Sequence, residues 1–188
     1  MNVYDAVLTN IAVREFTNES LKDQHLIQIL DAARLCQSGK NLQPWYFIII
    51  RDRSTLDALA ELMKGDIDEE IMKRSHTAIV IISDPRSEFD VVDAGRAAQN
   101  MTLAAWELGI GSVFISGPEP PERVPYRRKA KKLLGIPDHL NLVDLIVFGY
   151  PRRLRMVTRK NRKALKDIVF EGKFGNPITL NKPAASQE

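Results

Sequence analysis

Apolar runs and amphipathic stretches alternate along the chain and predict alternating strands and helices. Short continuous apolar runs, typical of buried strands, occur at 45–51 (WYFIIIR), 77–83 (TAIVIIS), 111–117 (GSVFISG) and 142–149 (LVDLIVFG). Helical patterns lie at 56–63 and 66–74, and a further helix is expected from Asp23, as its N-cap, to about Cys36. Continuous apolar strands between helices indicate a sheet that is covered on both faces.

The most informative helix is expected from about Val92 to Leu108. Alanines, Met101 and Leu108 form one stripe at the 3.6-residue period. A second, largely uncharged stripe holds Gly95, Gln99, Thr102, Leu103 and Trp106. A surface helix needs only one apolar face, so this pattern indicates a central helix buried on both sides. The pattern fits a subunit interface and the core of a monomer about equally well.

Length and composition favour a single globular domain over residues 1–188. Hydrophobic residues make up 44% and charged residues 27% of the chain, which is ordinary for a globular protein. No apolar run approaches the roughly 20 residues of a membrane span, and the N-terminus lacks the pattern of a secretory signal. Cys36 is the only cysteine, so no internal disulfide can form, and a cytoplasmic setting is expected. The tail, about 172–188, cannot pack on its own and is expected to be extended.

Basic residues give a net charge of +3 and cluster at 126–132 and 151–166. Clustered cations indicate an anionic partner such as nucleic acid, phosphate or an acidic surface. A solvated basic face is favoured for 126–132 and for Arg152, Arg153 and Arg155. The histidines are scattered in no metal-ligand pattern, so no metal site is expected.

A polar loop, CQSGKNLQPW, separates the helix from the first strand. Gly39 is expected to take positive φ and stop the helix, and the following proline is expected to hold Gln43 extended. Ser38, Asn41 and Gln43 supply hydrogen-bond donors and acceptors close together, which suits the edge of a planar heteroatom ring. By spacing alone, a self-satisfied polar turn is the favoured alternative.

The loop and several other motifs resemble the FMN-dependent nitroreductase family. AARLCQSGKNLQPWYFIII resembles the stretch after that family's second helix, and AVREF (12–16) resembles its N-terminal arginine motif. DAGRAAQNMTLAAWELGIGSVFIS is similar to its central helix and following strand, and KKLLGIP, FGYP and RKNRKALKDIVF match later landmarks. The resemblance covers nearly the whole chain in the family's order.

The resemblance implies an α+β, nitroreductase-like fold with a central mixed β-sheet flanked by helices. It implies a homodimer with the long central helix at the interface and with the tail able to embrace the partner subunit. Each of two shared sites would hold FMN, which would take hydride from NADH or NADPH and then reduce a flat oxidant such as a quinone or nitroaromatic, in ping-pong order. Neither nucleic acid nor a membrane is expected as a partner.

The family pattern assigns cofactor-binding roles by position, while the flavin itself would carry the hydride and no catalytic residue is assigned. Arg14 would lie near the flavin pyrimidine, where a cation favours the anionic reduced ring. Arg162, with Arg159, Lys160 or Lys163 nearby, would bind the phosphate. The remaining positions are Ser38, Gly39 and Asn41, from the partner subunit, and Ser116 and Gly117 beside the ring.

The chain departs from the family at Asn10, Ile11 and Ala12, where many members have two arginines and a serine. The loss of one charge-assisted bond would weaken FMN binding by roughly ten- to a hundred-fold. The departure leaves open another flavin, a deazaflavin or a degenerate, flavin-free member. Related flavin-fragmenting and dehalogenating activities also keep this fold. Nucleic-acid binding through 152–166 ranks low, because the run lacks interleaved aromatic residues.

Overall fold

The computed structural model describes residues 1–115, 124–153 and 160–178 of the chain. These residues belong to two separate units, Met1–Val157 and Thr158–Glu188. The single-domain organisation expected over 1–188 stays a prediction.

The first unit is built on one antiparallel sheet with the strand order β1-β2-β4-β3. Its strands are β1 (Trp45–Ile50), β2 (Thr77–Ser83), β3 (Gly111–Phe114) and β4 (Asn141–Gly149). In the described residues, the parallel component is an isolated bridge between Ala12 and Ser112 at the β3 edge. The predicted α+β class and the predicted strands at these positions are confirmed. Strand β3 ends at Phe114, before the end of the predicted apolar run 111–117.

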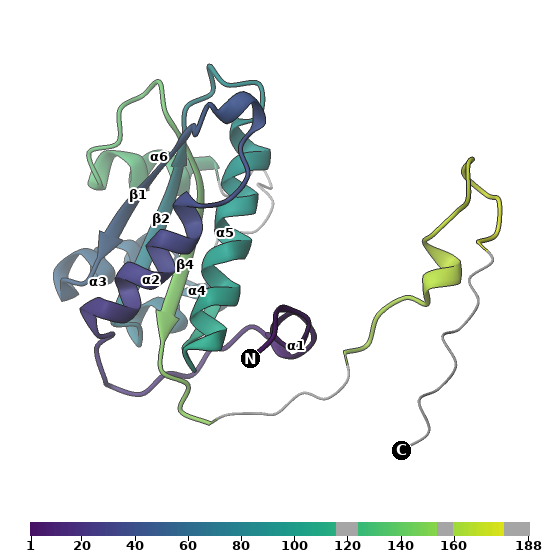
Figure 1. Cartoon of the computed structure of the whole chain (residues 1–188). Coiled ribbons are helices and arrows are strands. Elements are labelled where there is room, and N and C mark those ends of the chain that lie inside the picture. Colours follow the sequence, from purple (N-terminus) through teal and green to yellow (C-terminus); the bar gives the residue numbers. More distant parts are fainter. Residues whose placement is uncertain (116–123, 154–159, 179–188) are drawn as a thin grey trace. The chain divides into compact units, whose positions relative to one another are not determined.

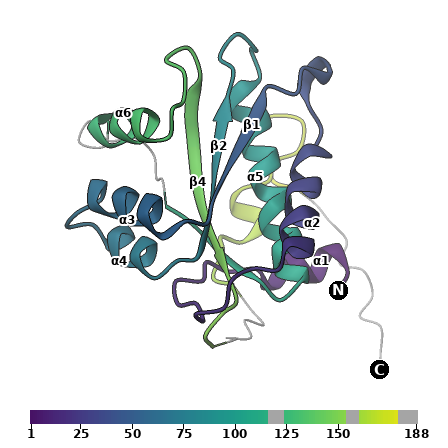
Figure 2. The ribbon, with the colours of Figure 1, turned by 90° about the vertical axis from the view of Figure 1, so that its left-hand side faces the viewer.

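Helices cover both faces of this sheet, as the continuous apolar strands predict. The helices are α1 (Val3–Thr9), α2 (Asp23–Arg34), α3 (Arg53–Leu62), α4 (Ile67–Lys73), α5 (Asp90–Glu107) and α6 (Val124–Leu133). Figure 1 shows the chain with these labels, and Figure 2 shows α3, α4 and α6 on one face and α2 and α5 on the other.

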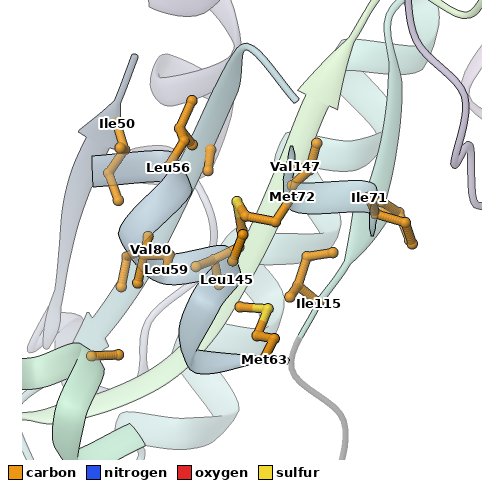
Figure 3. Close-up of a cluster of buried hydrophobic side chains, with 14 of the residues drawn as sticks. Ile50, Leu56, Leu59, Met63, Ile71, Met72, Val80, Ile115, Leu145 and Val147 are labelled. Carbon is orange, nitrogen blue, oxygen red and sulfur yellow. The ribbon is translucent and has the colours of Figure 1, made fainter. Parts of the chain in front are cut away.

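Two hydrophobic clusters fill the spaces between helices and sheet. On the α3 and α4 side, Leu56, Leu59 and Met72 pack with Val80 and Val147 of the strands (Figure 3). On the other side, α2 and α5 pack on the opposite face of the strands, and the buried members of that cluster include Ile29, Ala97, Met101, Ile79 and Phe148. Alternate residues of β2 thus enter different clusters, which explains why its whole run is apolar.

The start of α2 differs from the expected one. Lys22 occupies the N-cap position, and Asp23 is the first helical residue. The carboxylate of Asp23 forms an exposed ion pair with Arg51, 2.5 Å away, instead of capping the helix. The Asp23 side chain therefore pairs with a residue of another part of the chain and does not form the capping hydrogen bond that the local sequence favours.

Helix α5 is longer than expected and is buried on one face within this chain. Ala94, Ala97 and Met101 are fully buried, which confirms the first stripe. Gly95 and Gln99, on the second stripe, are exposed. Thr102 and Trp106, further along the same stripe, are buried within this chain, so the second stripe is exposed only in the first half of the helix.

The second unit holds a short 3₁₀ helix, Leu165–Asp167, and a turn. A bridge between Phe170 and Pro177 closes this turn, and the rings of Phe170 and Phe174 lie 4.5 Å apart. The turn includes the start of the tail that was expected to be extended, while residues 179–188 lie outside the described part of the chain.

Candidate functional site

The polar loop after α2 is anchored to α5 by a buried carboxylate. Asp93, in the first turn of α5, is fully buried, and its Oδ2 accepts a hydrogen bond from the Ser38 hydroxyl at 2.9 Å. The same oxygen accepts a hydrogen bond from the backbone N–H of Gly39, also at 2.9 Å. A buried acceptor satisfied by two donors holds the loop backbone at one place.

The other carboxylate oxygen of Asp93 is also occupied. Arg96 donates to Oδ1 from Nη1 at 2.9 Å, one turn further along α5. The positive charge of Arg96 compensates a buried negative charge that would be costly alone. Asp93 thus links the helix, its own counter-ion and the loop.

Cys36 lies beside this carboxylate as a protonated thiol. Its Sγ donates a long hydrogen bond, 3.9 Å, to the backbone carbonyl of Asp93. Burial first, and then the negative charge of Asp93, raise the pKa of Cys36, while Arg96 opposes them. A hollow of about 350 Å³ adjoins the thiol between α5 and the residues that follow α2, lined in part by Gln37 and Gln99. Such a thiol is a poor nucleophile at neutral pH.

The loop backbone differs from the expected path at two positions. Gly39 does not stop the helix through positive φ; α2 ends earlier, at Arg34, and positive φ falls on Lys40 (52°), Asn41 (56°) and Gln43 (48°). Gln43 is therefore not extended before its proline. Its backbone N–H donates to Ser38 Oγ at 2.8 Å, so closing the turn outweighs the local preference.

Gly39 is required for a different reason, which is the close approach of an aromatic ring. A Cβ added at Gly39 would lie 2.3 Å from a ring carbon of Phe89, well inside van der Waals contact. Lys40 also lies over that ring, 5.8 Å from its centroid, and pairs with Glu88. Non-glycine residues in the left-handed region cost energy and often mark functional loops.

The self-satisfied turn describes only part of the loop. The Ser38 hydroxyl and the Gly39 N–H are used inside the protein, and the exposed Gln43 amide donates to Asn41 O at 3.3 Å. The Asn41 side chain is exposed. The loop backbone is thus anchored inside the protein, and the Asn41 and Gln43 side chains lie at the surface.

Arg14 lies on a segment whose backbone is hydrogen-bonded to residues at the ends of β3 and β4. The backbone N–H of Val13 donates to Ser112 O at 2.9 Å, and that of Thr17 donates to Tyr150 O at 2.8 Å. Gly111 makes this approach possible, because a Cβ there would lie 2.6 Å from Val13. The Arg14 side chain, between these anchors, is exposed.

Asn10 has a structural contact at the place where the chain departs from the family pattern. Its side-chain amide donates to the backbone carbonyl of Thr102 in α5 at 3.1 Å. Close by, Trp106 Nε1 donates to Thr9 Oγ1 at 2.8 Å. Asn10 therefore ties the end of α1 to the central helix.

The remaining predicted residues are described only in part. Ser116, Gly117 and Arg159 lie outside the described residues. Arg162, in the second unit, is exposed and donates to Asn161 O at 2.8 Å. Desolvation first, and then the Arg162 charge, lower the pKa of Lys160, so these two cations lie close together in a place that favours an anion.

Asp93 and Phe89 are the site residues that sequence reasoning missed. In the sequence, Asp93 stands out only as the first residue of the motif DAGRAAQNMTLAAWELGIGSVFIS. Its signal was an acid placed on the small-residue stripe, one turn before Ala97. Over residues 1–115, 124–153 and 160–178, no group of three or more histidine, cysteine or acidic side chains could hold a metal ion. None of the described helices is long and apolar enough to cross a membrane.

The structure is an α+β fold with one sheet covered by helices on both faces and a polar loop anchored after α2, and comparison with known proteins assigns it to a family. The sequence model described as "Nitroreductase family" matches residues 11–78 and 64–150. An Archaeoglobus fulgidus protein named "Putative NADH dehydrogenase/NAD(P)H nitroreductase" is 35% identical over 152 residues, covering 78% of this chain and 83% of the relative. The chain therefore belongs to the nitroreductase family.

Solved structures agree with this assignment. A Parabacteroides distasonis protein with the same printed name as the archaeal relative superposes with a TM-score of 0.80 at 27% identity, covering 92% of this chain and all of that one. An "FMN-dependent Nitroreductase" from Clostridium difficile gives a TM-score of 0.77 at 25% identity, covering 87% of this chain and 96% of that one. The predicted family and fold are thus confirmed.

Proposed function

We propose that this protein is an FMN-dependent oxidoreductase that uses NADH or NADPH. The observation that carries the proposal is the anchoring of Ser38 and Gly39 by buried Asp93, which leaves the neighbouring Asn41 amide exposed for a ligand. Family membership and the FMN-dependent C. difficile neighbour support it. When bound, FMN would supply hydride transfer, with the nicotinamide and a flat oxidant such as a quinone or nitroaromatic using the site in turn.

Within each of the two units, the proposed groups have chemistry that suits part of this cofactor. Arg14 is an exposed cation that can sit beside the electron-rich edge of a ring and stabilise negative charge there. Arg162 and Lys160 form a cationic pair suited to a phosphate. Asn41 can both donate to and accept from a heteroatom ring, and Ser116 and Gly117 would complete the ring contacts.

A homodimer is part of this proposal, with Ser38, Gly39 and Asn41 reaching the flavin of the other subunit. Helix α1 supports it, because Val3, Tyr4 and Val7 are more than half exposed. Val91 and Val92 at the start of α5 are each 57% exposed. Apolar groups gathered on helices in this way mark protein interfaces.

A second candidate is a flavin-free or altered-flavin member. Asn10 favours it, because its amide is occupied by Thr102 and Ala12 offers no hydroxyl. In that case the protein would bind FMN weakly or not at all, or would prefer a deazaflavin.

The test is a visible spectrum of the purified protein with and without added FMN, followed by anaerobic NADH or NADPH. We expect a flavin spectrum that either donor bleaches, and a particle of two chains by light scattering. No flavin uptake at high micromolar FMN would overturn the proposal in favour of the second candidate.

A further inference from the structure

A basic hollow of about 700 Å³ lies in the first unit, at the end of α4 and beside the segment that follows Phe16. Its charged lining consists of Arg53, Lys73, Arg74, His76 and Arg152. Acidic residues are absent from the lining in the described part of the chain. From these groups we infer a second ligand site, one that binds small organic phosphates with two adjacent phosphoryl groups.

Arg53 is a cation that the fold holds in place. Its Nη1 donates to the Ser75 carbonyl at 2.8 Å, its Nη2 donates to the Met72 carbonyl at 3.3 Å, and Nη2 also pairs with Asp57 at 2.8 Å. These carbonyls belong to the end of α4, so the guanidinium joins α3 to α4. A guanidinium held in this way loses little further freedom when an anion binds.

Lys73 and Arg74 are both paired with acids of α4, and the Arg74 pair can be exchanged for an anion. Lys73 pairs with Glu69 at 2.5 Å, and Arg74 pairs with Glu70 at 3.1 Å. The Arg74 side chain is 67% exposed and that of Glu70 is 59% exposed. An exposed ion pair of this kind contributes little, so a ligand with two or more charges can displace Glu70 from Arg74. The Glu69 side chain is only 13% exposed, so Lys73 keeps its partner and adds positive charge beside the hollow.

Arg152 and His76 line the same hollow, and in the described residues neither is paired with an acidic side chain. In the described part of the chain, neither side chain forms a hydrogen bond or ion pair. The position of Arg152 is set by its backbone, because its N–H donates to the Glu15 carbonyl at 3.0 Å and Pro151 bridges Phe16. Arg152 is exposed, in keeping with the expected solvated basic strip, and the fold brings it to cations from two helices.

The chemistry of these groups selects the ligand. Arginine forks match phosphate oxygens, and the volume lies within the range of small-molecule sites. The cations come from α3, from the end of α4 and from the segment after β4. A diphosphate carries more charged oxygens than orthophosphate, so it can pair with more of these groups at once. None of Arg14, Ser38, Gly39, Asn41 and Arg162 lines the hollow, so this site goes beyond the proposed function.

The experiment measures binding of pyrophosphate, ADP and orthophosphate by isothermal titration calorimetry, with the protein first alone and then saturated with FMN. We expect saturable binding of pyrophosphate and ADP that FMN leaves unchanged, at least about ten-fold tighter than that of orthophosphate. Arg74→Gln and Arg152→Gln should each weaken it by about ten-fold or more. Arg128→Gln removes an exposed cation of α6 outside the hollow, and should change binding less than about two-fold.

Three results would overturn the inference. The first is the absence of saturable pyrophosphate binding at millimolar concentration. The second is a loss of pyrophosphate affinity in Arg128→Gln as large as that in Arg74→Gln and Arg152→Gln. The third is complete displacement of bound pyrophosphate by FMN. The last would assign the diphosphate to the flavin site. Circular dichroism melting of each variant shows that a loss is not unfolding, and the pyrophosphate-to-orthophosphate ratio tests the inference on the unmodified chain.

Discussion

The Asp93 carboxylate accepts a hydrogen bond from the Ser38 hydroxyl, 2.9 Å away and separated by 55 positions in the sequence. This bond connects the start of the central helix to the loop that the proposed flavin would meet. Because Asp93 is fully buried, the loop position is coupled to the packing of α5.

Replacement of Asp93 by asparagine should destabilise both the fold and the loop. Ser38, Gly39 and Arg96 all donate to this carboxylate, and an asparagine would turn one acceptor into a competing donor. We expect a loss of about 2–4 kcal/mol in the free energy of unfolding, measured in urea, and weaker FMN binding. Asp31→Asn makes the same chemical change at an exposed site on α2 and should have little effect on either. Equal, small changes in both variants would contradict the anchoring role.

Replacement of Gly39 by alanine should force Phe89 away from the loop. The added Cβ would lie 2.3 Å from the ring, so we expect a loss of about 1–3 kcal/mol in unfolding free energy. The matched control is Gly95→Ala, where nothing lies within 4 Å of the new Cβ. Adding Phe89→Leu to Gly39→Ala should restore part of the loss in a double-mutant cycle. A cycle with no coupling would show that the ring is not the obstacle.

The thiol of Cys36 should react slowly with iodoacetamide. Burial and the Asp93 charge raise its pKa, so less thiolate is present at pH 8 than for a free cysteine. We expect alkylation slower than that of glutathione, followed by mass spectrometry. Asp93→Asn removes the second cause and should speed the reaction, provided the variant is folded. Alkylation as fast as that of glutathione would contradict the raised pKa.

Asp84 should titrate at unusually low pH. Hydrogen bonds from the Arg86 side chain first, and then from its backbone, lower the pKa of Asp84 from 3.8 to about 2. Because the folded pKa is depressed, the associated stability is present above about pH 3.8 and is lost as pH falls toward 2. Arg86→Gln should return the pKa toward its ordinary value, as measured by NMR of the Asp84 carboxyl carbon. An unchanged titration in that variant would show that Arg86 is not the cause.

Much of the fold could be predicted because its strands are buried on both faces. β2 coincides with the predicted run, since Ala78 and Val80 face one cluster and Ile79 and Ile81 the other. The helix predicted from Asp23 began one residue away from its expected cap, because the carboxylate found a partner in Arg51. Local chemistry specified the elements, while partners from other elements adjusted their ends.

The sequence by itself determined the elements, the family and the polar loop as a candidate site, because periodicity and motifs are local properties. Only the tertiary structure decided that Asp93 anchors Ser38, that Gly39 makes room for Phe89, and that Arg152 joins Arg53 and Arg74 at one hollow. These contacts join residues far apart in the chain. Their energies depend on burial and approach in three dimensions, which no local pattern encodes.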